Sequence, residues 1–247
     1  IEILADNHFM DEKMKPAIAY LKKKSIQTVI HSIGLSLGGA KLPDLSYIEE
    51  LNKLRDLYDA CLFSEHIALV RSGGREAGHL LPVKRNEKTL KVLVENINFV
   101  QSRLTRPLVL ENIASFIEWP GNTIEESEFL ARLLKETGCG LLLDISNLYA
   151  NSLNNRFDPL EYLDKLPLSQ VEYVHIAGGV TMKGIYHDTH SHAVSPPVLD
   201  LLKAISLKIP RLPVLLERDD PFPLQDELFN ELDLIKDACF QREAVYA

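Results

Sequence analysis

The sequence predicts an α/β protein, a single (β/α)8 TIM-barrel domain that covers residues 1–247. Short apolar runs alternate with amphipathic helical segments along the whole chain, at the spacing of roughly 30–40 residues that βα units need. Most of these runs end in Asp, Glu, His or Asn, and parallel barrels collect their active sites at the carboxyl ends of the strands. The length also matches one barrel better than two small domains. A doubly wound open sheet is the alternative, and it would place the site at one crevice.

The predicted strands are the buried apolar runs. They cover residues 1–7, 27–31, 60–67, 107–111, 140–144, 171–176 and 213–217. The chain begins directly with IEILADN, so we expect that residues upstream of Ile1, including a first barrel strand, are absent from this numbering. That strand and the seven visible ones would close an eight-stranded barrel.

Helices are predicted between the strands from their apolar periodicity. They cover residues 11–24, 46–59, 86–104, 123–138, 158–167, 196–207 and 225–238. Pro16 fits only the first turn of its helix. A Thr-x-x-Glu capping box begins at Thr123, and Asp158 is the expected N-cap of the short helix that follows it.

The connections that follow strands are long, whereas the opposite ones are short. The long connections are residues 34–44, 71–85, 178–197 and 218–223, and they are polar or rich in glycine. Long loops on one face of such a fold are where function is expected.

Composition excludes several classes of protein. The net charge is −8 and no basic stretch could neutralise a phosphate backbone, so we expect no nucleic-acid partner. No apolar run approaches the ~20 residues that span a bilayer, so we expect no membrane association. The three cysteines are odd in number and lack CxxC spacing, which indicates reduced thiols in a cytoplasmic protein.

The densest polar feature is the segment 187–192, HDTHSH. In an extended segment Asp188 and His190 point to the same side, so both can reach one cation. Three histidines and an aspartate in six residues indicate a metal site, and the alternative is a solvated polar loop.

Polar residues also end the buried strands. Glu111 must be paired, protonated or bound to a metal, because an isolated buried charge is costly. An ion pair of Glu111 with Arg106 or Arg218 is the alternative. Asp144 offers a carboxylate and Asn147 an amide oxygen three residues later, although Asp144 could instead cap a helix.

Three histidines and one glutamate occupy matching positions on other strands. His31, His66 and His175 each lie near a strand end, and the glycines after His175 would let backbone approach a ligand closely. Glu217 ends the last strand, and Arg218 beside it can bind a substrate anion.

These residues predict a metal centre with nitrogen and oxygen ligands. The predicted ligands are His31, His66, Glu111, Asp144, Asn147, His175, Asp188, His190 and Glu217. Imidazole with carboxylate suits iron, manganese, zinc or cobalt. Nine ligands are too many for one ion, which indicates two or three ions, and a carboxylate such as Glu111 can bridge a pair about 3.5–4 Å apart.

Eight motifs follow one another along nearly the whole chain. They are HSIGLSLGG (31–39), SEHIA (64–68), HLLPVKRNEKTL (79–90), PLVLENIASF (107–116), TGCGLLLDISNLYANSLN (137–154), HIAGG (175–179), DTHSHAV (188–194) and LLERDD (215–220). Together they resemble the DUF692 family, the multinuclear non-haem iron-dependent oxidative enzymes. Two departures are His187, where the family usually has leucine, and Asp6 before Asn7, where it usually has glutamate.

The resemblance implies a xylose isomerase-like TIM barrel with two or three irons, for which zinc or manganese could substitute. It implies oxidation by dioxygen of cysteine residues in a ribosomally made precursor peptide, often with a small partner protein that presents the peptide. It marks the same nine positions as iron ligands or their neighbours. We expect catalytic roles for Glu111, Asp188 and His190, and substrate binding by Asn7, Asn112 and Arg218.

Two other classes of function use the same residues. A divalent-metal sugar isomerase or epimerase, or a phosphoester hydrolase, would have the same barrel and ligands but would act without oxygen. A non-catalytic, metal-bound scaffold would bind a peptide or partner. Replacing Glu111 or Asp188 with alanine would leave binding intact in a scaffold and abolish turnover in an enzyme.

Overall fold

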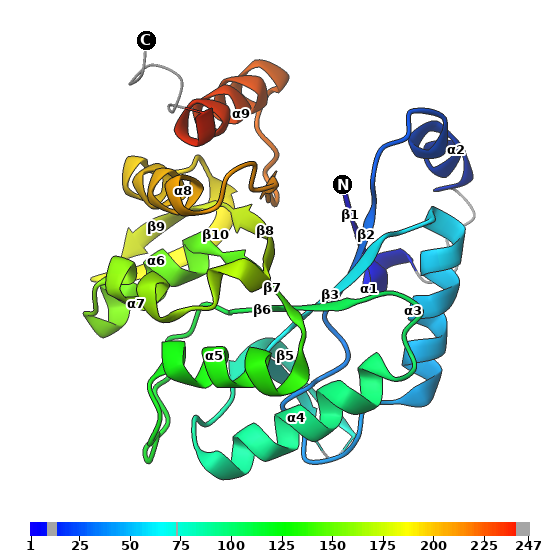
Figure 1. The fold of residues 1–247 in the computed structure, drawn as a ribbon. Helices are drawn as coiled ribbons and strands as arrows, with labels where there is room; N and C mark the ends of the chain where they lie inside the picture. The colour runs from blue at the N-terminus through cyan, green and yellow to red at the C-terminus, as the bar shows by residue number, and fades with distance from the viewer. Residues whose placement is uncertain (9–13, 73, 241–247) are drawn as a thin grey trace. The chain divides into compact units, whose positions relative to one another are not determined.

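The computed structural model describes residues 1–8, 14–72 and 74–240, without the side chains of Asn7, His8 and Lys15 (Figure 1). The chain divides into two compact units. The first unit consists of Ile1–Glu111 and Trp119–Leu141, and the second of Asn112–Glu118 and the residues from Leu142 onward. That residues 1–247 form one domain stays a prediction.

Four parallel strands form the sheet of the first unit. In order across the sheet they are β1 (Glu2–Leu4), β2 (Val29–Ser32), β3 (Leu62–His66) and β6 (Leu108–Glu111). The register places His31 opposite Ser64 and His66 opposite Glu111. Ile30, Phe63 and Leu110 are fully buried, as expected of parallel strands covered on both faces. The register therefore sets polar strand ends side by side above an apolar core.

Among its described residues, the first unit contains one short helix and four longer ones. They are α1 (Ala5–His8), α2 (Lys15–Lys23), α3 (Leu45–Tyr58), α4 (Glu87–Gln101) and α5 (Glu126–Thr137). α3 buries Ile48, Leu51 and Leu54 along one face. It begins where the Asp44 carboxylate accepts a hydrogen bond from the Ser46 amide, and it ends at Asp59 in the left-handed conformation.

The second unit holds most of β7 (Gly140–Asp144), with β8 (Val171–Ile176) beside it and β11 (Val214–Leu216) beside β8. β8 and β11 pair in parallel, with His175 opposite Leu215. The helices are α6 (Ile145–Asn155), α7 (Pro159–Lys165), α8 (Pro196–Lys208) and α9 (Gln225–Phe240), with the 3-10 turn η2 (Leu168–Gln170).

Two connections that the sequence predicted as loops are β-hairpins. β4 (Ala68–Ser72) pairs with β5 (Arg75–Pro82), and β9 (Gly178–Met182) pairs with β10 (Ile185–His192), both antiparallel. The β9–β10 turn has positive φ at Lys183 and Gly184, 52° and 80°, as two-residue hairpin turns require. The long connections predicted at 71–85 and 178–197 therefore contain strand pairs that the sequence analysis did not predict.

The seven predicted strands and six of the predicted helices are confirmed within a few residues. The first helix begins at Lys15 instead of residue 11, with Pro16 in its first turn as predicted, and residues 11–13 lie outside the described part. α5 begins at Glu126 without a side-chain cap, so the capping box from Thr123 does not form. The sequence predicted neither α6 nor α1, which follows β1 where the first predicted strand was expected to continue.

Two expectations from composition can be compared with the structure. Among the described residues, no helix is both long enough and apolar enough to cross a bilayer. Cys61, Cys139 and Cys239 are all free thiols.

Candidate metal centre

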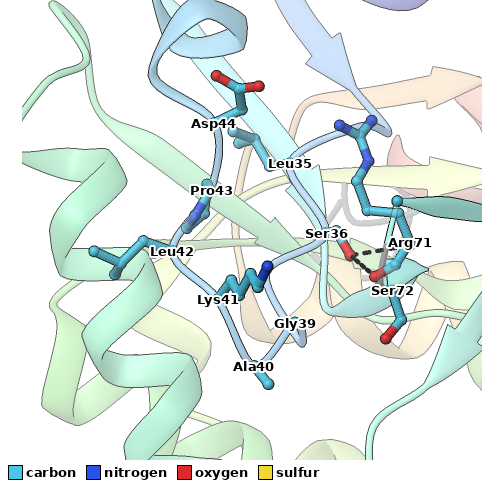
Figure 2. A pocket seen from close by; sticks show the side chains of 11 residues that line it. Leu35, Ser36, Gly39, Ala40, Lys41, Leu42, Pro43, Asp44, Arg71 and Ser72 are labelled. Carbon is cyan, nitrogen blue, oxygen red and sulfur yellow. Dashed lines mark hydrogen bonds between the residues drawn. The ribbon is translucent and has the colours of Figure 1, made fainter.

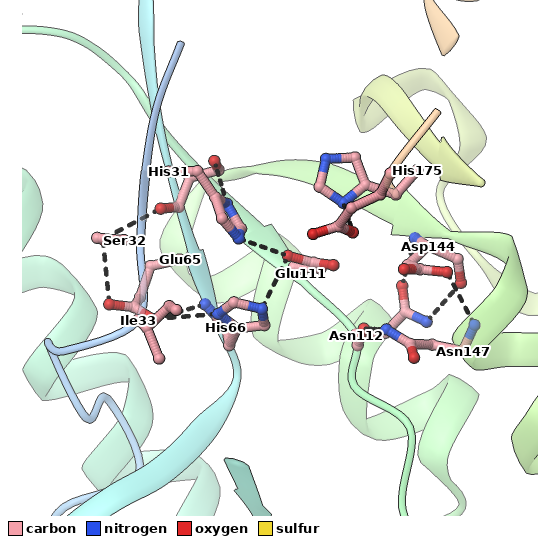
Figure 3. A network of polar contacts seen from close by, with 12 residues as sticks. His31, Ser32, Ile33, Glu65, His66, Glu111, Asn112, Asp144, Asn147 and His175 are labelled. Atoms are coloured by element: carbon pink, nitrogen blue, oxygen red, sulfur yellow. Dashed lines mark hydrogen bonds and ion pairs between the residues drawn. The ribbon is translucent and has the colours of Figure 1, made fainter. Parts of the chain in front are cut away.

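Three buried side chains of the first unit meet at the carboxyl ends of β2, β3 and β6 (Figure 3). His31 Nε2 lies 3.6 Å and His66 Nε2 lies 3.2 Å from the same atom, Oε2 of Glu111. The three residues are 2%, 8% and 2% exposed, respectively. We call His31, His66 and Glu111 the first cluster. Two imidazole nitrogens and one carboxylate oxygen within 4.8 Å of one another can hold a cation.

The Nδ1 atoms of both imidazoles, on the side away from Glu111, have polar neighbours as well. His31 Nδ1 lies 2.8 Å from Ser64 Oγ, and His66 Nδ1 lies 3.5 Å from Glu65 Oε1. Metal-binding histidines usually use one ring nitrogen for the metal and the other for such a partner, which fixes the orientation of the ring. The arrangement therefore directs both Nε2 atoms to Glu111.

Glu65 is a buried neighbour of the first cluster whose position the sequence did not indicate. Its side chain is 1% exposed and accepts hydrogen bonds from the amides of His66 (2.8 Å) and Leu35 (2.9 Å) and from Ser32 Oγ (3.1 Å). These bonds hold the carboxylate beside the imidazole of His66. The only signal in the sequence was its position directly before His66 at a strand end.

Replacing Glu65 with glutamine is expected to lower the metal affinity of the first cluster by about 10–100-fold, the usual effect of losing such an outer partner. The neutral amide attracts the proton on His66 Nδ1 less strongly, so the ring is held less firmly. Competition with a coloured chelator measures the affinity. Glu76→Gln, at an exposed position of β5, is the matched control. Equal affinities for Glu65→Gln and the control would contradict this role.

Five residues of the second unit form another polar group. His175 Nδ1 and His190 Nδ1 lie 3.2 Å and 3.4 Å from the same atom, Glu217 Oε2. Ligand atoms of Asp144, His175 and Glu217 lie within 4.8 Å of one another, and so do those of Asp144, Asp188 and His190. We call these five residues the second cluster. Asp144 belongs to both triads.

Asp188 and His190 meet through an irregular strand. His190 Nε2 lies 2.6 Å from Asp188 Oδ2, so the two side chains are close together. The cause is not plain alternation along a strand, because the pairing of β10 with β9 shifts between Asp188 and His192. His190 has φ of +53°, a left-handed conformation that costs energy in residues other than glycine and is concentrated at functional sites. The segment is thus a partly buried strand, and a metal site there stays a prediction.

The charges of the second cluster shift its pKa values. Burial acts to lower the pKa of His190, but hydrogen bonds and charge from Asp188 and Glu217 outweigh it and raise the pKa to about 11. Burial acts to raise the pKa of Glu217, yet His175 and His190 hold it well below its usual range. Without a cation, His190 therefore carries a proton at neutral pH, and a cation bound by His190 would replace that proton.

A network of amides supports Asp144 (Figure 3). Its Oδ1 accepts hydrogen bonds from the amides of Ser146 and Asn147 at 2.7 and 2.8 Å, so Asp144 does cap a helix, α6. The Asn112 side chain donates to the Asp144 carbonyl (2.9 Å) and accepts from its amide (3.0 Å). Asn147 Nδ2 donates to the Asn112 carbonyl at 3.1 Å. Substrate binding by Asn112 and metal ligation by Asn147 stay predictions.

The other predicted residues have the following surroundings. Arg218 lies 3.4 Å from Glu231 of α9, both about one-tenth exposed, and its substrate-binding role stays a prediction. Asn7 is in α1, but its side chain lies outside the described part. Convergence of the two clusters on one mouth also stays a prediction.

The donors of both clusters fit a bound metal. They are imidazole nitrogens and carboxylate oxygens, which suit iron, manganese, zinc or cobalt. In the second cluster three carboxylates face two histidines, so a divalent cation would offset the repulsion among the carboxylates. The two histidines beside Glu111 likewise fit a cation site.

Solved structures share this fold. D-psicose 3-epimerase from Clostridium cellulolyticum H10 superposes with a TM-score of 0.64 at 12% identity, over 96% of this chain and 86% of that one. A xylose isomerase-like TIM-barrel protein from Mycobacterium smegmatis in complex with magnesium gives 0.61 at 12% identity, over 97% and 83%. Endonuclease IV from Thermus thermophilus gives 0.59 at 21% identity, over 93% and 82%. The protein is thus an α/β protein of the xylose isomerase-like TIM-barrel class, which confirms the predicted fold over a doubly wound sheet.

The family follows from the sequence matches. The model of the RiPP precursor modification enzymes MbnB/TglH/ChrH matches residues 1–239, and the chain belongs to this family. Two relatives, both named UPF0276 protein, come from Streptomyces avermitilis (40% identity over 243 residues) and Caulobacter vibrioides (32% over 236 residues). Each match covers 96% of this chain, which spans 50% of the Streptomyces relative and 84% of the Caulobacter relative. The resemblance to DUF692 is confirmed, and the family is one of enzymes.

Proposed function

We propose that the protein is an iron-dependent enzyme that uses dioxygen to modify cysteine residues in a ribosomally made precursor peptide. The observation that carries the proposal is the pair of imidazole–carboxylate clusters, one buried and one partly buried, in a chain of a peptide-modifying family. The match of this chain to a family of RiPP precursor modification enzymes supports a peptide as substrate. The cluster chemistry supports the metal.

The nine predicted ligands would hold two or three irons. His31, His66 and Glu111 would form one site, and Asp144, His175, Asp188, His190 and Glu217, with Asn147, would form the rest. When bound, iron would supply the redox chemistry with dioxygen that amino-acid side chains lack. Zinc or manganese could occupy the same donors.

The side chains of the clusters would position the reacting groups. Asp188 holds His190 by a 2.6 Å contact, and a carboxylate beside an imidazole fixes its tautomer and increases its basicity. Glu111 holds the two Nε2 atoms of the first cluster in one direction. We therefore keep Glu111, Asp188 and His190 as the proposed catalytic residues. Burial of Glu111 and Asp144 would exclude water from competing at the cation.

Oxygen consumption tests the proposal. Protein prepared without oxygen and loaded with iron is mixed with the precursor peptide encoded beside its gene, together with any small partner protein encoded there. We expect oxygen uptake and a change in peptide mass, because a cysteine thiol is the proposed reacting group. The same peptide with serine in place of each cysteine is the control and should give neither.

Two outcomes would contradict the proposal. One is iron-loaded protein that consumes no oxygen with any neighbouring peptide. The other is a zinc, manganese or magnesium protein that epimerises a ketose or cleaves a phosphoester without oxygen, which would establish the alternative class. Cytoplasmic location and the peptide-presenting partner stay predictions.

A further inference from the structure

The first unit contains a pocket of about 380 Å³ between the loop at residues 34–44 and the β4–β5 hairpin (Figure 2). Leu35, Leu42 and Pro43 supply apolar surface to it, and Lys41 and Arg71 supply two cations. Its volume is within the usual range for small-ligand sites. The proposed chemistry of the metal clusters gives this pocket no role.

Hydrogen bonds fix the loop that forms one wall. Ser36 has φ of +54°, and its Oγ accepts hydrogen bonds from the amides of Val70 (3.0 Å) and Arg71 (3.2 Å). The buried Asn96 side chain donates to the carbonyls of Leu37 and Gly39, both at 2.8 Å. A strained residue held by several bonds is over-determined by its surroundings. The pocket is therefore formed before any ligand binds.

The polar groups of the pocket favour an anion. Asp44 also lines the pocket, with its Oδ1 bonded by the amide and hydroxyl of Ser46, both at 2.9 Å, and its one negative charge is outnumbered by Lys41 and Arg71. Arg71 Nε lies 3.2 Å from Glu76, whose side chain is 67% exposed, and such exposed ion pairs are weak. A ligand carboxylate could replace Glu76 and form a bidentate pair with the guanidinium, through two parallel hydrogen bonds. Lys41 is exposed and adds a second positive charge.

The pocket is joined to the first cluster through Glu65. The amide of Leu35, a wall residue, donates to Glu65 Oε2 at 2.9 Å. The other oxygen of Glu65 lies 3.5 Å from His66 Nδ1. One carboxylate thus holds both the pocket wall and a predicted metal ligand in place. An occupant of the pocket would have a fixed position relative to the first cluster.

We infer that this pocket binds an acidic side chain of the peptide substrate. The methylene groups of the aspartate or glutamate, and an apolar neighbour, would pack on Leu35, Leu42 and Pro43, and its carboxylate would pair with Arg71 and Lys41. The pocket would set the register of the peptide at the first cluster. The inference rests on the proposed function, because it takes the ligand to be the peptide substrate.

Binding of short peptides to the full chain tests the inference without iron or oxygen. The probes are N-acetyl-Leu-Glu-amide, N-acetyl-Leu-Gln-amide and inorganic phosphate, followed by NMR of leucine methyl groups and arginine Nε–H groups. We expect the glutamate peptide to shift Leu35, Leu42 and Arg71 and to bind at least about fivefold more tightly than the glutamine peptide. Phosphate should shift Arg71 but not the leucine methyl groups.

Matched variants locate the effect. Arg71→Gln should abolish the preference for glutamate, whereas Arg75→Gln, the same charge change at an exposed position of the same hairpin, should retain it. Thermal unfolding of both variants checks that each is folded. Equal affinity for the two peptides, an unchanged preference in Arg71→Gln, or equal leucine shifts with phosphate would each overturn the inference. None of these results depends on oxygen uptake, so this inference and the proposed function can fail separately.

Discussion

Replacing Glu111 with glutamine is expected to empty the metal site of the first cluster and to lower turnover by more than about 100-fold, beyond the usual effect of losing an outer partner. Glu111 Oε2 is the atom that the Nε2 atoms of both His31 and His66 face. An amide at this position is neutral, and its NH2 group would repel a cation. Loss of the Glu111 carboxylate therefore weakens the binding of a cation held between it and the two histidines.

Metal content per chain and thermal unfolding measure this loss. A cation at 100 times its Kd stabilises a folded protein by about 2.7 kcal/mol, or roughly 5–10 °C in a chain of this size. Glu111→Gln should lose the share of this stabilisation that comes from a cation bound at the first cluster. Glu95→Gln, at an exposed position of α4, is the control and should keep both metal and activity. Full metal content with normal turnover in Glu111→Gln would refute the first cluster as a metal site.

The metal-free protein is expected to lose stability as the pH rises from about 7 to 11, because of His190. Its pKa in the folded chain is raised to about 11, above that of a histidine in an unfolded chain. A raised pKa stabilises the folded state fully below the unfolded value, and this stabilisation disappears as the pH rises through the folded value. The loss should be on the order of a few kcal/mol, since each pKa unit corresponds to about 1.4 kcal/mol.

Urea unfolding of metal-free protein at pH 7 and pH 10 measures this change. His190→Gln should flatten the decline, and His79→Gln, at an exposed position of β5, should not. Comparing the two variants removes the background from lysine and tyrosine titration. Metal affinity should show the opposite trend and increase with pH, because the cation competes with the proton on His190. A decline that is the same in both variants would show that His190 is not the titrating group.

The strands could be predicted from the sequence, whereas α6 and the hairpins could not. Each parallel strand is a short, continuous apolar run, and burial on both faces requires that pattern. α6 contains Asn147, Asn151, Asn154 and Asn155, residues with low helix propensity. Its N-cap at Asp144 and its burial stabilise it instead. The hairpin strand β5 is largely exposed, so it lacks the apolar signal of a strand.

The members of the clusters could be predicted, but their orienting partners could not. Residues at the ends of parallel strands lie at one edge of a sheet, so His66 and Glu111 were expected to be neighbours and are opposite each other. The carboxylate of Glu65 is held beside His66 in part by hydrogen bonds from residues distant in the sequence, such as Leu35. The bulge at His190 likewise depends on pairing with β9. Such long-range contacts leave no local pattern in a single sequence.

Asp144 links the folding of α6 to the proposed cation site. The same carboxylate begins α6 and contributes to both triads of the second cluster. A molecule in which that helix started elsewhere would also lose this donor, so wrongly assembled copies would be inert. Substitution at this position is therefore expected to act twice, on the start of the helix and on the cation site.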